Sequence, residues 1–135
     1  MGLFEQVGVF NLPALKINIL KDKSFAFSVR IVKLYKHLTQ EQREFVMSKQ
    51  LLRSGTAIGA IYREAEQAES RADFIHKISM SLKECNETLY WLELLHATEY
   101  LNDMAYKSIF SDAEELIKLL TSILKTSKAK AKASR

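Results

Sequence analysis

Two glycines that lie four residues apart constrain the fold of this chain more than any other feature. Gly55 and Gly59 fall within residues 53–70, a stretch whose other residues favour helix. Each glycine costs about 1 kcal/mol relative to alanine in a helix interior. Close approach of a second helix is the usual compensation, because glycine has no side chain to hold the neighbour away. A second helical run, residues 73–95, follows almost at once. The pattern therefore predicts a helical bundle with a tight contact at its centre.

Apolar residues recur in alternating steps of three and four in four segments, which is the spacing of one helix face. They predict helices over residues 24–38, 40–69 and 73–95, and a fourth that starts at residues 102–103. Predicted N-caps are Ser24, Thr39 (in a capping box that ends at Gln42) and Ser70. Four such helices joined by short links indicate an all-α, antiparallel up-down four-helix bundle.

The chain is long enough for one domain with a core of its own. Residues 23–125 are predicted to form the bundle. Residues 1–22 are interrupted by a glycine and a proline and are predicted to be an N-terminal arm, with a short strand at residues 15–20 as an alternative. Residues 126–135 alternate lysine with alanine and serine, so a basic, disordered tail is expected there.

The positive and negative charges fall in different halves of the chain. Residues 16–63 hold ten Lys/Arg and three Asp/Glu, whereas residues 64–124 hold five Lys/Arg and twelve Asp/Glu. Residues 125–135 add five positive charges and no acid. Such a split can tie two halves of one bundle together, dock one subunit on the next, or present a basic face to nucleic acid.

Nothing in the sequence indicates an enzyme or a membrane protein. The chain has no apolar run of the ~18 residues needed to span a bilayer, and its single cysteine, Cys85, favours a reducing, cytoplasmic setting. Cys85 lies on an apolar stripe and is interpreted as a core residue. Glu93 and His96 match the Glu-x-x-His motif of di-iron bundles, but those proteins need two such motifs. Neither a metal nor a cofactor is therefore expected.

Charged residues next to the apolar stripes need partners, because an unpaired buried carboxylate costs several kcal/mol. Arg53 is predicted to pair with Glu84 or Glu87, either within a subunit or across an interface. Glu64, near the far end of the second helix, is a further candidate for a structural ion pair.

Basic residues in the first half and in the tail form a candidate nucleic-acid surface. They are Arg30, Lys33, Lys36, Lys49, Arg53, Arg63, Lys128, Lys130 and Lys132. Contacts of lysine and arginine with phosphates give affinity without sequence preference and weaken as salt rises. The alternative is a solvated or subunit-docking face on a protein-interaction scaffold. In that scaffold, aromatic residues such as Tyr62, Tyr90 and Trp91 anchor the contacts.

Several motifs at fixed spacing give the chain a family resemblance. They are Arg53-Ser-Gly-x-x-Ile-Gly-Ala, Arg63-Glu-Ala-x-x-Ala-x-Ser70, Asp73-Phe-Ile-x-Lys77 and Leu82-Lys-Glu-x-x-Glu-Thr-x-Tyr-Trp-Leu92. Over about residues 20–125 the sequence resembles the bacterial four-helix-bundle family named for the 23S rRNA intervening-sequence protein. One departure is Ile61-Tyr62, where the family usually has Asn-Ile after Gly-Ala.

The resemblance implies a bundle that assembles as a homo-oligomeric ring, typically a pentamer, without known catalytic activity. Some family members are encoded inside insertions in ribosomal RNA genes. A related accessory protein of diversity-generating retroelements binds nucleic acid and the reverse transcriptase. The resemblance therefore implies three kinds of partner, namely further copies of the chain, RNA or DNA, and a reverse transcriptase.

Overall fold

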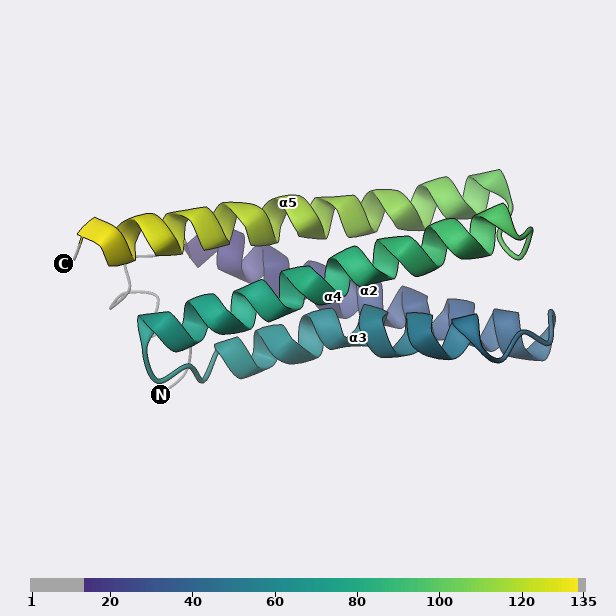
Figure 1. The fold of residues 1–135 in the computed structure, drawn as a ribbon, viewed down its shortest axis with the longest axis horizontal. Coiled ribbons are helices and arrows are strands. Elements are labelled where there is room, and N and C mark those ends of the chain that lie inside the picture. The colour runs from purple at the N-terminus through teal and green to yellow at the C-terminus, as the bar shows by residue number, and fades with distance from the viewer. Residues whose placement is uncertain (1–13, 134–135) are drawn as a thin grey trace.

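The computed structural model describes residues 14–133, and every regular element in that range is an α-helix. The helices are α2 (Ala14–Gln40), α3 (Met47–Ala65), α4 (Arg71–Ala97) and α5 (Asp103–Ala133). They lie side by side as one bundle (Figure 1). The predicted all-α class and four-helix bundle are confirmed.

The three links lie at the two ends of the bundle. The α2–α3 and α4–α5 links meet at one end, where Gln42 Nε2 donates a hydrogen bond of 2.8 Å to the carbonyl of Tyr100. The α3–α4 link lies at the other end, near the start of α2 and the end of α5 (Figure 1). There the Lys21 ammonium lies 3.2 Å from Glu66, one residue past α3.

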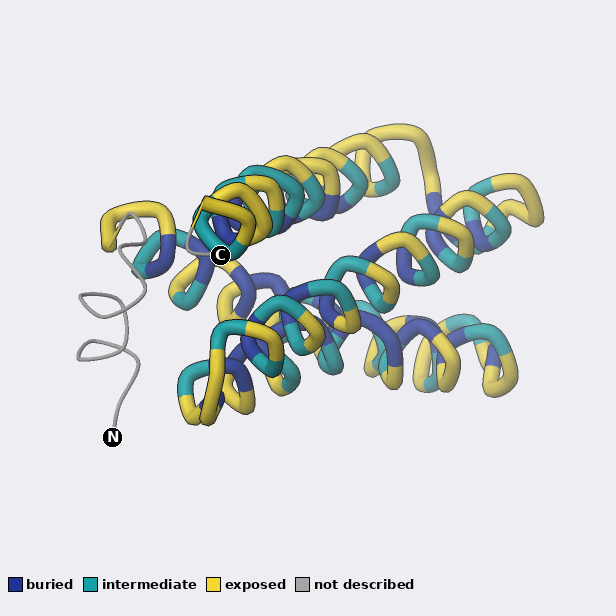
Figure 2. The backbone as a smooth tube through the Cα atoms, turned by 60° about the vertical axis from the view of Figure 1, so that its left-hand side comes forward, coloured by how far each residue is buried: buried dark blue, intermediate teal, exposed yellow. Residues whose placement is uncertain are grey.

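The core is a set of apolar side chains contributed by all four helices. In Figure 2 the buried positions face inward and the exposed positions follow the outside of each helix. The largest fully buried side chains include Ile31, Leu38, Leu51, Ile58, Tyr62, Phe74, Ile78, Leu92, Leu95 and Leu116. Their spacing of three and four residues explains why these segments are helical, because each helix buries one face.

The two glycines of α3 face α2, which is the helix that approaches them. A Cβ atom at Gly55 would lie 2.8 Å from Cγ1 of Ile31, and one at Gly59 would lie 3.3 Å from the carbonyl oxygen of Ser24. Both partners are buried. The absence of side chains at these two positions therefore sets the distance between α2 and α3.

The first helix begins earlier than expected. Residues 14–22 belong to α2, so the predicted strand at residues 15–20 and the N-cap at Ser24 are wrong. Ile17 and Leu20 extend the buried stripe in the same steps of three and four, and burying them holds the additional turns on the bundle. Ser24 lies inside the helix, where its hydroxyl donates to the Lys21 carbonyl. The rest of the predicted arm, residues 1–13, lies outside the described residues.

The predicted start of the second helix is also wrong. Thr39 lies in the last turn of α2 and donates to the Tyr35 carbonyl at 2.9 Å. α3 begins only at Met47, where the Glu44 carboxylate accepts hydrogen bonds from three successive backbone amides. A carboxylate at this position satisfies orphan amides and complements the helix dipole.

Two further predicted boundaries can be compared with the structure, namely the end of α3 and the start of α4. α3 ends at Ala65 rather than Glu69. The predicted cap at Ser70 is confirmed, because its hydroxyl accepts from the Asp73 amide at 3.0 Å.

The predicted disordered tail is helical as far as the structure describes it. α5 continues to Ala133, and Ser127 is only 1% exposed. Lysine and alanine are strong helix formers, and packing at Ser127 anchors the added turns. Residues 134–135 lie outside the described range.

We predict that Gly55→Ala lowers the free energy of unfolding by about 1–2 kcal/mol, because the methyl group would overlap the buried Ile31. In an Ile31→Ala background the same change should instead stabilise the protein, since the clash is gone and alanine favours helix by about 1 kcal/mol. Urea unfolding of the wild type, the two single variants and the double variant measures whether Gly55→Ala destabilises or stabilises the protein in each background. Equal effects of Gly55→Ala in the two backgrounds would contradict the close-contact interpretation.

We predict that Glu44→Gln lowers the free energy of unfolding by about 1 kcal/mol at neutral pH. Burial opposes ionisation of Glu44, but the three amide hydrogen bonds outweigh it and hold the pKa below the ordinary 4.5. The ionised group therefore stabilises the fold above pH 4.5. That contribution is lost as the pH falls through the lower folded-state pKa. Denaturation of both proteins across this range should show their stabilities converging in acid, and a constant difference would contradict the cap.

Candidate functional site

Ion pairs between the basic and acidic halves of the chain join helices within the subunit. Arg30 of α2 lies 2.5 Å from the Asp112 carboxylate of α5, and its other terminal nitrogen donates to the Ser108 hydroxyl at 3.1 Å. Lys23 lies 2.7 Å from Glu115, also on α5. Part of the charge split therefore fastens α2 to α5, and Arg30 is not a free cation.

Arg53 lies between two acids of α4. One terminal nitrogen is 3.0 Å from Glu84, and the other contacts Glu87, which also accepts a 2.9 Å hydrogen bond from the Trp91 indole. The indole hydrogen bond first, and Arg53 second, hold the pKa of Glu87 below its usual range. The geometry is the pairing expected from the sequence, and it lies within one subunit.

The two remaining charged candidates at the far end of α3 have different surroundings. Glu64 lies 3.5 Å from the Lys77 ammonium of α4. The Arg63 guanidinium lies 6.0 Å from the ring centre of the exposed Phe25 on α2. Glu64 therefore has a structural ion pair, whereas Arg63 has an aromatic neighbour on the outer surface of α2 and α3.

Several exposed lysines have no acidic partner. Within residues 14–133, no ion pair includes Lys33 and Lys36 of α2, Lys49 of α3, or Lys128 and Lys132 of α5. Lys130 is half-buried and lies on a different side of α5. The candidate basic surface thus separates into paired arginines and uncompensated lysines.

The outer surface of α2 carries a row of exposed apolar side chains. Phe25, Val29 and Val32 are 61%, 39% and 36% exposed, and they follow one another at steps of four and three. Lys36 continues this row by one more turn. We call Phe25, Val29 and Val32 the α2 stripe. A row of three large, exposed apolar side chains on one helix is more typical of a contact surface than of a face that is only solvated.

An acidic and aromatic patch lies on α4 and α5. Glu93 of α4 and Glu114 of α5 both act on Tyr106, whose pKa is raised first by burial and then by these two carboxylates. Tyr90, 56% exposed, meets Trp91 edge to face with ring centres 5.0 Å apart, whereas Tyr62, which was also expected to anchor contacts, is fully buried. Tyr90 precedes Glu93 by three residues, so an exposed aromatic ring and negative charge lie one turn apart on α4. We call Tyr90, Glu93 and Glu114 the α4–α5 patch.

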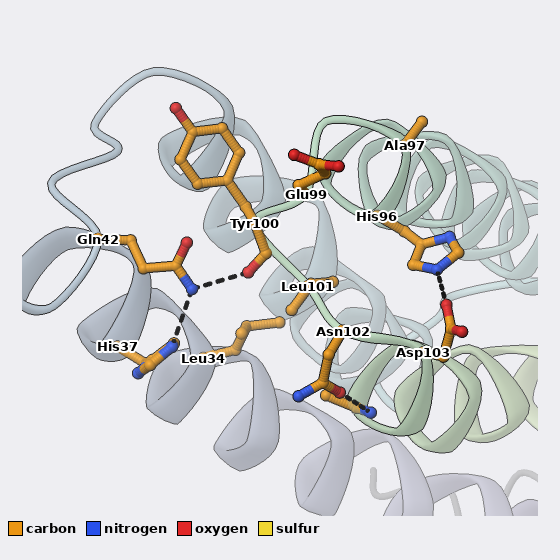
Figure 3. Close-up of a pocket in the computed structure, with 11 residues that line it drawn as sticks. Leu34, His37, Gln42, His96, Ala97, Glu99, Tyr100, Leu101, Asn102 and Asp103 are labelled. Atoms are coloured by element: carbon orange, nitrogen blue, oxygen red, sulfur yellow. Dashed lines mark hydrogen bonds and ion pairs between the residues drawn. The ribbon is translucent and has the colours of Figure 1, made fainter.

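The bundle end that carries two links contains a polar hollow of about 710 Å³. Figure 3 shows His37 against Gln42, with a separation of 3.1 Å, and His96 against Asp103, with a separation of 2.6 Å. Sequence reasoning missed this hollow because its residues come from two separate links and from the helices that they join. Within residues 14–133 no group of three or more His, Cys, Asp or Glu could hold a metal ion, and His96 has Asp103 as its carboxylate partner.

Cys85 is fully buried, and its thiol donates to the Ala113 carbonyl at 3.4 Å. Burial raises the pKa of this thiol to about 12, so it is protonated at neutral pH. A protonated, buried thiol is unsuited to nucleophilic attack. In the part of the chain that the structure describes, no helix is long and apolar enough to cross a membrane.

The fold and surface define a four-helix bundle protein with charged outer faces. The chain belongs to the 23S rRNA-intervening sequence protein family, whose model matches residues 16–122. It is similar to a crystal structure of a protein of unknown function from the S23 ribosomal protein family of Bacteroides thetaiotaomicron VPI-5482. That similarity is 64% identity over 82% of this chain and 98% of the other, with a TM-score of 0.81. Comparison with curated proteins finds no match.

We predict that Arg53→Gln changes duplex-DNA affinity less than twofold, because two carboxylates already neutralise Arg53. The half-exposed ion pairs should contribute at most about 1 kcal/mol to the free energy of unfolding. Fluorescence anisotropy with labelled duplex measures the first effect, and urea unfolding measures the second. A large loss of affinity with unchanged stability would place Arg53 in the binding surface.

Proposed function

We propose that this protein is a non-enzymatic, antiparallel four-helix subunit of a homo-oligomeric ring that binds RNA or DNA through phosphate contacts. The observation that carries the proposal is the set of exposed lysines without acidic partners within residues 14–133, in contrast with the paired Arg30 and Arg53. Uncompensated lysines on a helical surface supply electrostatic, sequence-independent affinity.

The short links support the antiparallel arrangement. They comprise only residues 41–46, 66–70 and 98–102, and links of this length connect helices that run in opposite directions. The colour gradient in Figure 1 also reverses from each helix to the next.

A second copy of the chain is the proposed partner of the α2 stripe. The α4–α5 patch offers complementary chemistry, because exposed Tyr90 can meet the apolar row while Glu93 and Glu114 approach Lys36 and neighbouring cations. Contacts between two different faces of identical subunits close into a ring when the rotation permits. The family resemblance implies five subunits.

A protein-interaction scaffold is the second candidate function, and the exposure of the α2 stripe is the observation that favours it. In this case the stripe binds a different protein, and the resemblance suggests a reverse transcriptase. The two candidates differ in whether nucleic acid adds mass to the purified protein.

Light scattering of the purified protein, with and without a mixed-sequence RNA or DNA duplex, tests the proposal. A stable oligomer that gains mass with duplex at low salt and loses that gain at moderate salt would support it. An oligomer that ignores duplex would favour the scaffold. A monomer would exclude the ring.

We predict that Val29→Glu lowers the oligomeric mass, because it places a charge in the centre of the α2 stripe. Ser111→Glu adds the same charge at an exposed position of α5 and serves as the control. Both variants should keep the helical content of the wild type by circular dichroism. An unchanged mass for Val29→Glu would place the subunit interface on another face.

A further inference from the structure

The last turns of α5 carry three exposed lysines on one side. Lys125, Lys128 and Lys132 are spaced by three and four residues, which places them within about 60° of one another around an ideal helix. On the other side, Ile123 is fully buried and Ser127 is 1% exposed. We call the three lysines the α5 ridge. Packing through Ile123 and Ser127 fixes the direction in which the ridge faces.

The α5 ridge lacks compensating negative charge. Residues 116–135 contain no aspartate or glutamate, and no ion pair within residues 14–133 includes a ridge lysine. One turn earlier, Lys16 of α2 donates to the Ser122 hydroxyl, which brings a further cation to this part of α5. The last turn of α5 also reaches beyond the ends of the other three helices (Figure 1).

We propose that the α5 ridge binds the phosphate backbone of double-stranded nucleic acid and is the main nucleic-acid contact of this protein. This inference rests on the proposed function. The ridge extends over about 10 Å at 1.5 Å per residue. One strand of a duplex carries a phosphate about every 3.4 Å along its axis, so the length of the ridge spans about three such intervals.

The composition of this part of α5 favours a duplex over two other anionic partners. No aromatic residue follows Phe110, so the ridge has no side chain on which unpaired bases could stack. The exposed residues after Leu124 are lysine and alanine within the described range. A helix that inserts into a lipid surface needs large apolar side chains on its exposed side.

Lys36 of α2 is less suited to be the main contact. Lys36 continues the row of the α2 stripe, so a subunit seated on that stripe would cover it. The α5 ridge lies beyond residue 122, where the match to the family model ends. The ridge shares no residue with the α2 stripe or the α4–α5 patch, so it lies outside the proposed subunit contact.

Two variants of equal charge test the inference in the full-length protein. The ridge variant is Lys125→Gln, Lys128→Gln and Lys132→Gln, and the face variant is Lys33→Gln, Lys36→Gln and Lys49→Gln. Both lose three positive charges and keep good helix formers. Affinity for a short mixed-sequence DNA duplex is measured by fluorescence anisotropy at several salt concentrations.

The ridge variant should bind duplex at least about tenfold more weakly. Its slope of log affinity against log salt should be shallower by about 2.7 for each subunit that contacts the duplex. The face variant should lose less affinity than the ridge variant, because the ridge is the main contact. Replacing the three ridge lysines by arginine should restore binding, since arginine keeps the charge. Helical content should be unchanged in all variants, and oligomeric mass should be unchanged in the ridge variant and in the arginine variant.

Other results would overturn the inference in distinguishable ways. Loss of binding in the face variant but not in the ridge variant would reject the ridge and leave the proposed function intact. A wild type that ignores duplex would reject both. Ridge-dependent binding that is tighter to single-stranded DNA, or to vesicles containing phosphatidylserine, would reject the duplex as the ligand.

Discussion

The close contact between α2 and α3 determines which side chains the rest of the molecule can use. Gly55 and Gly59 let Ile31 and Ser24 approach α3, and this fixes the rotation of α2 about its own axis. With that rotation set, Lys23 and Arg30 meet acids of α5. The α2 stripe lies on the far side of the same helix and remains exposed. The packing of α2 against α3 thus determines which cations form ion pairs within the subunit and leaves the α2 stripe exposed for a partner.

The separation of basic and acidic residues along the chain has two structural consequences, which composition alone cannot distinguish. Within the subunit it supplies ion pairs that join α2 to α5 and α3 to α4, such as Arg30 with Asp112 and Arg53 with Glu84. These pairs are half-exposed, so they contribute little to stability. Outside the subunit the split leaves lysines of α2, α3 and α5 without acids within residues 14–133. The total of 20 lysine and arginine residues therefore overstates the cationic surface that is available to a ligand.

Sequence periodicity predicts the fold class well because burial of one helix face leaves a strong signal. It also identifies the Arg53 cluster, where an arginine on one helix needs carboxylates on the next. Local cap motifs are less reliable, since Thr39 fits a capping box yet lies inside α2 and donates to a carbonyl one turn earlier. Glu44 performs the capping instead. The hollow at the double-link end is not predictable in this way, because tertiary packing brings together residues such as His37 and His96 from distant segments.

The helical end of α5 changes what a basic terminus can do. A disordered, lysine-rich tail must lose conformational entropy when it binds, at a backbone cost of about 1–2 kcal/mol for each residue that becomes ordered. Packing at Ser127 has already fixed the backbone of α5 around the ridge lysines. The lysines then project from a rigid element whose length of about 10 Å spans about three phosphate intervals of a duplex strand. Because less conformational entropy is lost on binding, the same electrostatic contacts give an ordered ridge a higher affinity than they would give a flexible tail.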